Sequence, residues 1–484
     1  MSNASLKEEM GVGDLRLVTS PAQPEKGELH QGFGIWSLLT LAITVGGYWG
    51  TALQLMAVGL VSGGPAVLLW GVLILDAGTL ALGLTLGEMA SAYPSAAGPV
   101  EYAYQFAPKR WAREFSYLTG CLLYVGYFTG AVATFAIPAQ QVVYLAIAFH
   151  PDYVPKQWHV ELVMQGLLFL CIMLNIYGIK LIEHWILVWF VGGWLIWCIV
   201  PIATTESLQK ASFVFGSFIN ETGWGSMPTY KELPNPRIDL PRAMWMSPVA
   251  GSTMTFIVTV LVLFAMSDVE GTISAPTGLP YAQIVLDATG SPAAMVCLTV
   301  ILTGLSCAAC LSIQVATTRI AFSFAREGGL VFPETLAKIH PKLQVPVNAI
   351  IFCWILEGLL SLLYLGPTTA YNSFLSLVVI LSLTAYAVCI VLLLLRKRHY
   401  SPVIPTHPFK LPNLIGWVLN SFSLVFCLLL AVFLYFPTTN PTSVLSMNYA
   451  VVIVAGFGVM GLAGWFVSGR KTYAIDRSPD PMEL

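Results

Sequence analysis

Charged residues are scarce in this 484-residue chain. Lys, Arg, Asp and Glu together make up 10% of it, whereas hydrophobic residues make up 56%. A soluble domain has about 25% charged residues, because its surface must be hydrated. So low a charge content excludes a string of soluble globular domains and indicates a protein whose solvent is the lipid bilayer.

The sequence also lacks the signatures of several other classes. The net charge of −2 and the absence of a basic run with interleaved aromatic residues argue against a nucleic-acid partner. The histidines form no HxxxH or HExxH spacing, and no glycine-rich loop ends in Gly-Lys-Ser/Thr, so zinc-hydrolase and P-loop pump chemistry are unsupported. No convergent acids, nucleophiles or metal ligands are visible. We therefore expect neither an enzyme nor a bound metal or cofactor.

No cysteine lies in a polar connection. All nine fall inside apolar stretches, which argues against an extracellular disulfide framework. Cys307 and Cys310 form a CxxC, but the stretch has no second pair, so we interpret them as small packing residues rather than a redox or metal site. The polar residues 1–30 contain no apolar core before a cleavage site, and no cleaved signal peptide is expected.

The sequence is rich in long hydrophobic blocks. Most are roughly 20 residues or longer, the length that an α-helix needs to cross about 30 Å of hydrocarbon. About eleven candidate spans cover 33–61, 64–86, 115–146, 160–178, 184–203, 247–266, 292–318, 347–365, 373–395, 413–436 and 446–468. They lack the alternation of barrel strands, so we predict an all-α integral membrane protein. One transmembrane domain at 33–468 would lie between cytosolic tails at 1–32 and 469–484.

Lys and Arg gather in some connections and avoid others. They occur in the N-terminal tail, in 109–113, 319–342 and 396–410, and in the C-terminal tail, whereas 267–290, 366–372 and 437–445 have none. Positive residues mark the cytosolic side of a membrane protein. Both termini are therefore predicted to be cytosolic.

The two halves of this charge pattern conflict. Five blocks, an odd number, separate the connections at 109–113 and 319–342, although both have cytosolic character. The polar segment 204–246 has no run long enough to cross. Its first part carries the sequon at Asn220, which we predict to be exoplasmic and glycosylated, and its second part, from Asn235 to Arg242, is of cytosolic type. We infer that one transmembrane helix is missing between them.

The first span contains the run TVGGYWG at residues 44–50, near mid-membrane. Close helix packing through glycine is one interpretation. The other is a broken helix whose unwound backbone binds a solute, because free N–H and C=O groups at the midplane are typical transporter sites. Gly46, Gly47, Tyr48 and Trp49 would then bind the solute, with the two aromatic rings offering a cation–π face to an ammonium group.

Four charged residues inside or at the ends of spans are candidates for coupling or gating. Asp76 and Glu357 lie near the middle of their spans, where an ionised carboxylate is costly, so each should face the bundle interior, pair with a cation or take up a proton. A neutral acid bound to backbone is the structural alternative. Glu88 and Arg319 close two spans at the cytosolic side and would form a gate ion pair or simply anchor helix ends.

Short motifs recur along the whole chain. They are WSLL at 36–39, SGGP at 62–65, GEMASAYP at 87–94, FSYLTG at 115–120, FVF at 213–215, NPR at 235–237, PTGLP at 276–280 and FAREGGL at 324–330. Together they resemble the amino acid–polyamine–organocation (APC) permeases, specifically the fungal branch of choline, γ-aminobutyrate (GABA) and amino-acid permeases. The resemblance extends from Gly32 to about Lys471.

The resemblance implies a twelve-helix fold with two inverted five-helix repeats and two C-terminal helices. In such permeases the first and sixth helices are broken at the substrate site. The first break in the family often has Thr-Asn-Ser-Trp, and here Trp49 matches whereas Gly47 and Tyr48 depart. Where the family would place the sixth helix, this chain has only the short polar stretch 225–234.

The predicted function is secondary active transport of a small amine or amino-acid-like solute, such as an amino acid, GABA or choline, by alternating access. The partners would be this solute, the lipid bilayer and a coupling proton, in the plasma or vacuolar membrane. The missing helix leaves a second hypothesis open, a sensor or regulatory homologue, or a defective isoform, that does not transport.

Overall fold

The computed structural model describes residues 48–95, 97–150, 152–205, 208–216, 236–273, 275, 279–366, 368–398, 408–436 and 447–475. Within these ranges the regular elements are all helices. The long ones are α3 (Met56–Ala92), α5 (Ala112–Phe149), α6 (Gln157–Tyr177), α7 (Ile179–Thr204), α9 (Pro236–Ala265), α12 (Pro292–Arg326), α14 (Val347–Ser361), α15 (Thr368–Leu395), α16 (Asn413–Phe433) and α17 (Ala450–Gly464).

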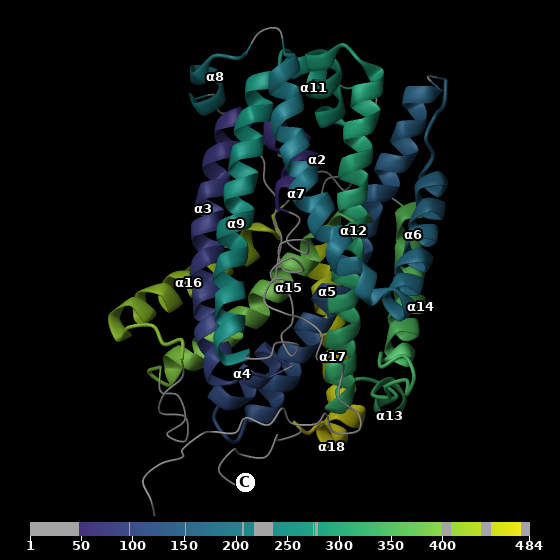
Figure 1. Cartoon of the computed structure of the whole chain (residues 1–484). Coiled ribbons are helices and arrows are strands. Elements are labelled where there is room, and N and C mark those ends of the chain that lie inside the picture. The colour runs from purple at the N-terminus through teal and green to yellow at the C-terminus, as the bar shows by residue number, and fades with distance from the viewer. Residues whose placement is uncertain are drawn as a thin grey trace, which may run out of the picture.

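Shorter helices connect or extend the long ones. They are α2 (Tyr48–Gln54), α4 (Pro99–Phe106), α8 (Ala211–Gly216), α10 (Val269–Ile273), α11 (Pro280–Thr289), α13 (Pro333–Leu336), η1 (Leu362–Leu365), a π-helical turn η2 (Trp465–Gly469) and α18 (Arg470–Thr472). Figure 1 shows the long helices standing side by side as a bundle.

Nine helices in the described part of the chain are long and apolar enough to cross a membrane, and α7 contributes a shorter apolar stretch at Trp189–Thr204. These match ten of the predicted blocks. The first half of the first block, 33–61, lies outside the described residues, which begin at Tyr48, so the predicted total of about eleven stays a prediction. The all-helical membrane class is confirmed.

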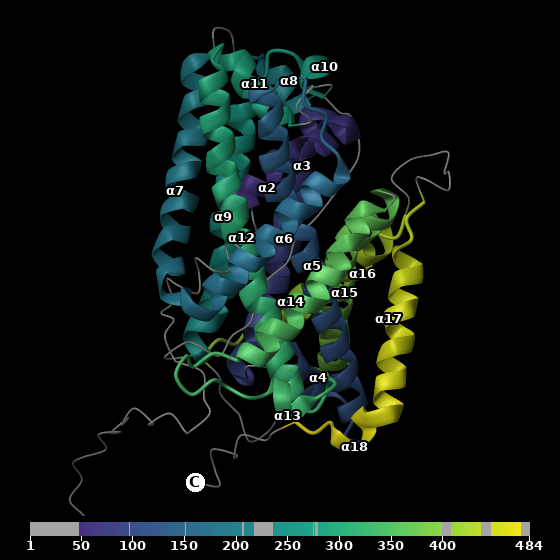
Figure 2. The same ribbon diagram turned by 90° about the vertical axis from the view of Figure 1, so that its right-hand side faces the viewer.

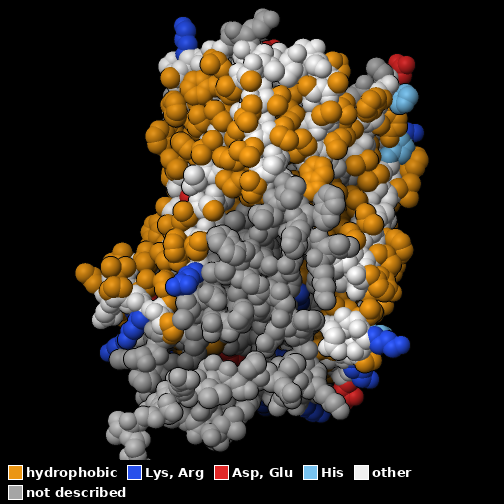
Figure 3. Space-filling view, viewed as in Figure 1, with side chains coloured by type: hydrophobic (Ala, Val, Ile, Leu, Met, Phe, Trp, Pro, Cys, Tyr) orange, Lys and Arg blue, Asp and Glu red, His pale blue; other side chains and the backbone are white. Residues whose placement is uncertain are grey.

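The bundle surface is apolar, as a lipid-facing surface must be. Hydrophobic side chains cover much of the described face in Figure 3, whereas Lys and Arg side chains lie mainly toward the lower end of this view. The C-terminal helices α16 and α17 lie on one side of the bundle (Figure 2). Outward side chains such as Leu414 of α16, and Phe466 of the turn η2 that follows α17, are at least 70% exposed.

Small residues allow the central helices to approach one another closely, which is how membrane helices pack without a hydrophobic driving force. On α5, Gly130 lies against Val378 of α15, and Gly120 lies against Phe324 of α12. Gly83 of α3 leaves room for the backbone carbonyl of Met244 on α9. The result is a pair of adjacent helices, α3 and α9, beside a core of α5, α12 and α15.

The basic connections meet at one end of the bundle. The Arg113 side chain donates to the carbonyl oxygens of Arg470 (3.1 Å) and Tyr473 (2.6 Å), and Arg396 donates to that of Gln105 (2.5 Å). The backbone N–H of Ala474 donates to the Glu327 carbonyl oxygen. The segments with positive residues at 109–113, after α12, after α15 and at the C-terminus therefore share one face.

The two sides of the 204–246 segment lie at opposite ends of the bundle. Just before α8, the Gln209 N–H donates to the Phe264 carbonyl oxygen (2.9 Å), which places α8 beside the C-terminal end of α9. α9 begins at Pro236 and is about 45 Å long, at 1.5 Å per residue, so its first residue lies far from α8. Figure 1 shows α9 extending along the bundle away from α8. The last residue of α8, Gly216, and the first residue of α9, Pro236, therefore lie at opposite ends of the bundle.

Candidate functional site

The first described residues follow the predicted helix break. Gly46 and Gly47 lie outside the described residues, and α2 begins at Tyr48. The chain leaves helical geometry twice soon afterwards, at Leu55 and at Gly64. Gly64 has φ 64° and ψ −163°, a conformation that is essentially restricted to glycine. This explains the glycine at the turn between the first two spans.

Tyr48 and Trp49 are packed against neighbouring helices. The Tyr48 ring occupies the space that a Cβ on Gly251 of α9 would need. Trp49 is fully buried, packs edge-to-face on Phe190 of α7 at 6.1 Å, and lies close to Gly193 of the same helix. Its indole N–H has no hydrogen-bond partner. The two aromatic residues thus attach α2 to α9 and α7.

A group of polar side chains surrounds the end of α2, and we call it the Gln54 cluster. It consists of Gln54 of α2, Gln141 of α5, Tyr281 of α11 and Ser306 of α12. Gln54 Nε2 donates to Ser306 Oγ (2.7 Å), and Ser306 Oγ lies 3.3 Å from Gln141 Oε1. Tyr281 lies beside Gln141 and packs edge-to-face on Trp197 of α7. Four helices therefore converge on one polar point.

Several donors and acceptors in and near this cluster are unsatisfied. Gln141 Nε2 and Tyr281 Oη are buried without a hydrogen-bond partner, as is Trp49 Nε1. A buried polar group without a partner costs about 1–3 kcal/mol. Such a set, inside an apolar core, is chemically suited to bind a small polar molecule.

Asp76 lies on α3 in the neighbourhood of Tyr48. It interacts electrostatically with the Tyr48 ring, and the Ser252 side chain of α9 lies beside it. Its Oδ2 is buried without a hydrogen-bond partner, and no basic side chain of the described ranges pairs with it. The structure therefore brings together Asp76 and Tyr48, two of the residues that the sequence singled out.

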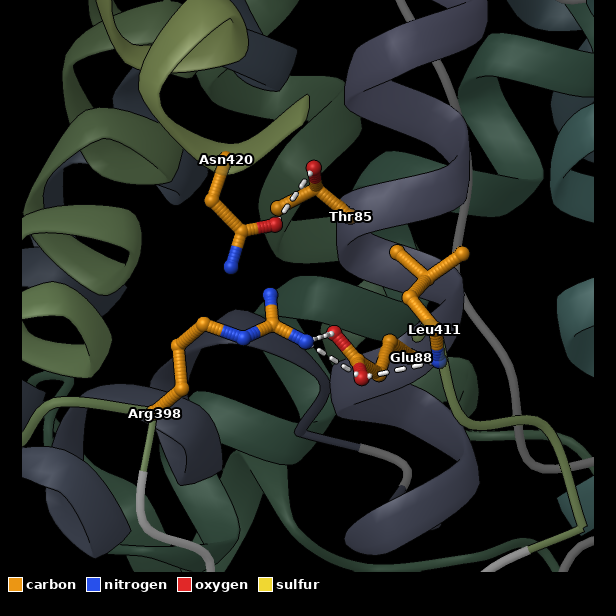
Figure 4. A network of polar contacts seen from close by, with 5 residues as sticks. All are labelled: Thr85, Glu88, Arg398, Leu411 and Asn420. Atoms are coloured by element: carbon orange, nitrogen blue, oxygen red, sulfur yellow. Dashed lines mark hydrogen bonds and ion pairs between the residues drawn. The ribbon is translucent and has the colours of Figure 1, made fainter. Parts of the chain in front are cut away.

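Glu88 belongs to a buried polar network at the basic end of the bundle, which we call the Glu88–Arg398 cluster (Figure 4). Glu88 is fully buried, and both its carboxylate oxygens accept from Arg398 Nη2, at 2.8 and 2.9 Å. The Leu411 N–H adds a third hydrogen bond at 3.0 Å. The Asn420 amide of α16 lies 3.1 Å from Thr85 Oγ1 and beside the guanidinium. The cluster connects α3 to the chain after α15 and to α16.

Local backbone geometry directs Arg398 inward. Lys397 and Arg398 follow the last residue of α15 with φ of 51° and 56°, a left-handed conformation that non-glycine residues seldom adopt. Gly416 of α16 leaves room for the guanidinium, because a Cβ there would lie 2.1 Å from Nη2. No sequence pattern connects Arg398 with Glu88, since 310 residues separate them.

The remaining candidates lie on α12 and α14 or outside the described residues. Arg319 is partly buried in the C-terminal part of α12, and Glu357 is fully buried in α14. The gate pair of Glu88 with Arg319 stays a prediction. Asn220 lies outside the described residues. Among the residues that the structure describes, no three His, Cys, Asp or Glu side chains could hold one metal ion, and Cys307 and Cys310 are free thiols.

Comparison with known proteins places the chain in a family. A family model described as amino acid permease matches residues 33–457. The choline transporter of Saccharomyces cerevisiae is 27% identical, over 93% of this chain and 84% of its own length. A Macrophomina phaseolina protein named as a candidate amino acid/polyamine transporter is 30% identical, over 83% and 94%.

A third relative, amino-acid permease 2 of Neurospora crassa, is 25% identical over 93% of this chain and 88% of its own length. The buried polar cluster within an apolar helical bundle agrees with this class of protein. The chain therefore belongs to the amino acid permease family of the APC superfamily, as a transmembrane solute transporter and not an enzyme.

Proposed function

We propose that the protein is a secondary transporter that moves a small amine or amino-acid-like solute by alternating access, with the Gln54 cluster as part of the solute site. The observation that carries this proposal is the set of unsatisfied groups beside α2, on Gln141, Tyr281 and Trp49. A solute that satisfied them would recover the cost of their burial. The fungal relatives named for choline, amino acids and polyamines support this solute class.

The chemistry around α2 suits a zwitterion or an amine. The amide N–H of Gln141 and the indole N–H of Trp49 can donate to a carboxylate, as can the free backbone that we expect at Gly46 and Gly47. Asp76, without a basic partner, and the Tyr48 ring beside it can attract an ammonium group. Choline would use only this second half of the site, and an amino acid would use both.

Coupling, gating and orientation complete the proposal. Asp76 and Glu357 are the candidates for a coupling proton, and Glu88 with Arg319 are the candidates for a cytosolic gate. The end of the bundle that carries the basic connections would face the cytosol, at the plasma or vacuolar membrane. Asn220 would then be exoplasmic. Glycosidase digestion of wild type and Asn220→Gln tests this, and a cytosolic label on a cysteine at position 220 would contradict it.

A non-transporting sensor, or a defective isoform, is the second candidate function. The observation that favours it is the position of Gly216 and Pro236 at opposite ends of the bundle. The stretch between them contains Glu221, Lys231 and Glu232, and charged residues are costly inside a bilayer. For this candidate, we propose that an apolar sixth helix has been lost from this gene model or isoform.

The decisive experiment compares this chain with a version in which an apolar sixth helix has been restored between residues 224 and 235. Solute uptake by cells expressing each version separates transporter from sensor, and sequencing the mature transcript across codons 220–240 shows which version is made. Gly47→Leu in the transporting version should abolish uptake without loss of expression. Unchanged uptake in Gly47→Leu would favour the packing interpretation of the glycines.

A further inference from the structure

Glu357 is an acid without hydrogen-bond partners in the interior of the bundle. It lies about 15 Å along α14 from Val347, roughly halfway across a bilayer. Its side chain is fully buried, and neither carboxylate oxygen has a hydrogen-bond partner. An ionised carboxylate in such a position would be strongly disfavoured.

Two further polar side chains face Glu357 from other helices. The Gln314 amide of α12 lies against the carboxyl group, and both its Nε2 and its Oε1 are buried without a hydrogen-bond partner. Tyr124 of α5 interacts electrostatically with Glu357, and its buried hydroxyl lies beside the Cys353 thiol of the same helix as Glu357. We call Tyr124, Gln314 and Glu357 the Glu357 site.

A second buried acid nearby, Glu161, has hydrogen-bond donors beside its carboxylate. Glu161 of α6 is 4% exposed, and its Oε1 accepts from Gln165 Nε2 (2.8 Å) and Ser361 Oγ (2.7 Å), whereas its Oε2 is buried without a partner. Gln165 and Ser361 thus supply donors to Glu161 from α6 and α14, whereas the described neighbours of Glu357 leave both its oxygens free. The difference indicates that Glu357 is not held as a permanently hydrogen-bonded structural acid.

Resting on the proposed transport function, we propose that the Glu357 site binds and releases the coupling proton, separately from the solute cluster. When the carboxylate takes up a proton, its new O–H can donate to Gln314 Oε1 while its other oxygen accepts from Gln314 Nε2. When the proton leaves, Gln314 Oε1 loses its donor. The protonated form thus satisfies both atoms of the amide, and the ionised form satisfies one.

The surroundings favour a proton over a metal cation. The titratable groups that interact with Glu357 are Tyr124 of α5, Cys171 of α6 and Cys353 of its own helix. Within the described ranges no Lys, Arg or His is among them. Hard metal cations take about six or more oxygen ligands, and the Glu357 site offers four oxygen atoms at most.

Two helices connect the Glu357 site with the Gln54 cluster. On α12, Gln314 lies about 12 Å from Ser306, and on α5, Tyr124 lies about 25 Å from Gln141. A shift of either helix on solute binding would alter the contact between Gln314 and Glu357. Proton binding at the Glu357 site and solute binding at the Gln54 cluster would therefore be coupled through movements of α5 and α12.

The first test does not require transport. Infrared difference spectra of the purified protein, recorded on stepping the pH, should contain a carboxylic-acid carbonyl band that disappears in Glu357→Gln and persists in Glu161→Gln, the matched buried control. Glu357→Asp, which keeps the acid, should retain a shifted band. It is the control for a loss of the band that is caused by misfolding of Glu357→Gln. A wild-type spectrum without a titrating band that depends on Glu357 would overturn the proposal.

The second test uses proteoliposomes. Glu357→Gln should exchange labelled solute across the membrane within about threefold of wild type, because the neutral amide mimics the protonated acid, but should lose accumulation driven by a pH gradient. Accumulation and proton flux equal to wild type would overturn the proton site. A wild type that shows the titrating band but carries no solute would contradict the proposed transport function and leave the proton site standing.

Discussion

The Glu88–Arg398 cluster and the Gln54 cluster are both polar groups buried in an apolar protein, yet they differ in how completely they are satisfied. The Glu88 carboxylate accepts three hydrogen bonds, from Arg398 and from the Leu411 N–H. In the Gln54 cluster, by contrast, Gln141 Nε2 and Tyr281 Oη have no partner. A satisfied network stabilises one arrangement of helices. An unsatisfied one retains binding capacity for a molecule that the protein does not itself supply.

Removal of one charge from the satisfied cluster should have the largest effect. Glu88→Gln leaves the buried Arg398 guanidinium without its counter-charge, and breaking a buried pair costs about 3–5 kcal/mol. We expect a large fall in the unfolding temperature and in the amount of folded protein in detergent. The exposed Asp287→Asn is the matched control and should change neither quantity.

The double variant Glu88→Gln with Arg398→Met tests whether the unpaired charge is the cause of this loss of stability. Because it removes both charges, it should recover much of the stability that Glu88→Gln loses. Equal stability losses in the single and the double variant would show that the ion pair is not what holds α3 to the segment after α15.

A steric change at Gly416 should have an intermediate effect. In Gly416→Ala the new Cβ would overlap the Arg398 guanidinium, and overpacking of this kind costs about 1–3 kcal/mol. Thermal unfolding in detergent measures the loss. Gly456 of α17 has open space around it, so Gly456→Ala is the control. A similar loss in both variants would indicate a general effect on helix glycines and not on Arg398.

The unsatisfied cluster should respond in the opposite way, with little effect on stability and a large effect on function. Gln141→Leu removes an amide whose Nε2 has no partner and whose Oε1, among the described residues, accepts only from Ser306, at 3.3 Å. Because Ser306 can still donate to the Leu302 carbonyl oxygen, stability should change by less than about 1 kcal/mol. Loss of one or two solute hydrogen bonds should lower uptake by roughly 10- to 100-fold. Parallel measurements of unfolding temperature and uptake check both halves of this prediction.

The smallest effect concerns Glu101 of α4, outside the membrane spans. Burial raises the pKa of Glu101, although the hydrogen bond from Gln105 acts in the opposite direction. The folded protein therefore holds this proton more tightly than the unfolded chain does. Its contribution to stability is present below about pH 4.3, the ordinary glutamate value, and is lost as the pH rises through the raised pKa.

Glu101→Gln should flatten this part of the stability–pH curve. Unfolding in denaturant, measured at several pH values for wild type and variant, provides the test. A difference between the two proteins that does not change with pH would contradict the predicted shift.

Hydropathy alone predicted the membrane helices, because a helix in lipid must bury or satisfy every backbone group within itself. It also located Asp76 and Glu357 as acids inside spans, since charges there stand out, and Glu88 as a charge at the cytosolic end of a span but not as a buried one. The side of the membrane assigned to the connections rests on Lys and Arg and stays a prediction. These properties depend on local sequence and can therefore be recognised in a single chain.

The partners of these acids could not be predicted, because they come from distant parts of the chain. Arg398 resembles the other positive residues after α15, and only its left-handed backbone turns it inward toward Glu88. Gln54, Gln141 and Ser306 were visible as polar residues in apolar blocks, but their convergence depends on how α2, α5 and α12 pack. A search for unexplained polar side chains inside spans would have found them as candidates, though not as a cluster.

The most direct test of the account is uptake of labelled choline, GABA and amino acids into proteoliposomes that contain the wild-type chain or Gln141→Leu at equal protein content. We predict saturable uptake of at least one of these solutes by wild type, and a loss of roughly tenfold or more in the variant without a change in unfolding temperature. Equal uptake by the two proteins, or no uptake by wild type, would contradict the assignment of the Gln54 cluster as the solute site of a transporter.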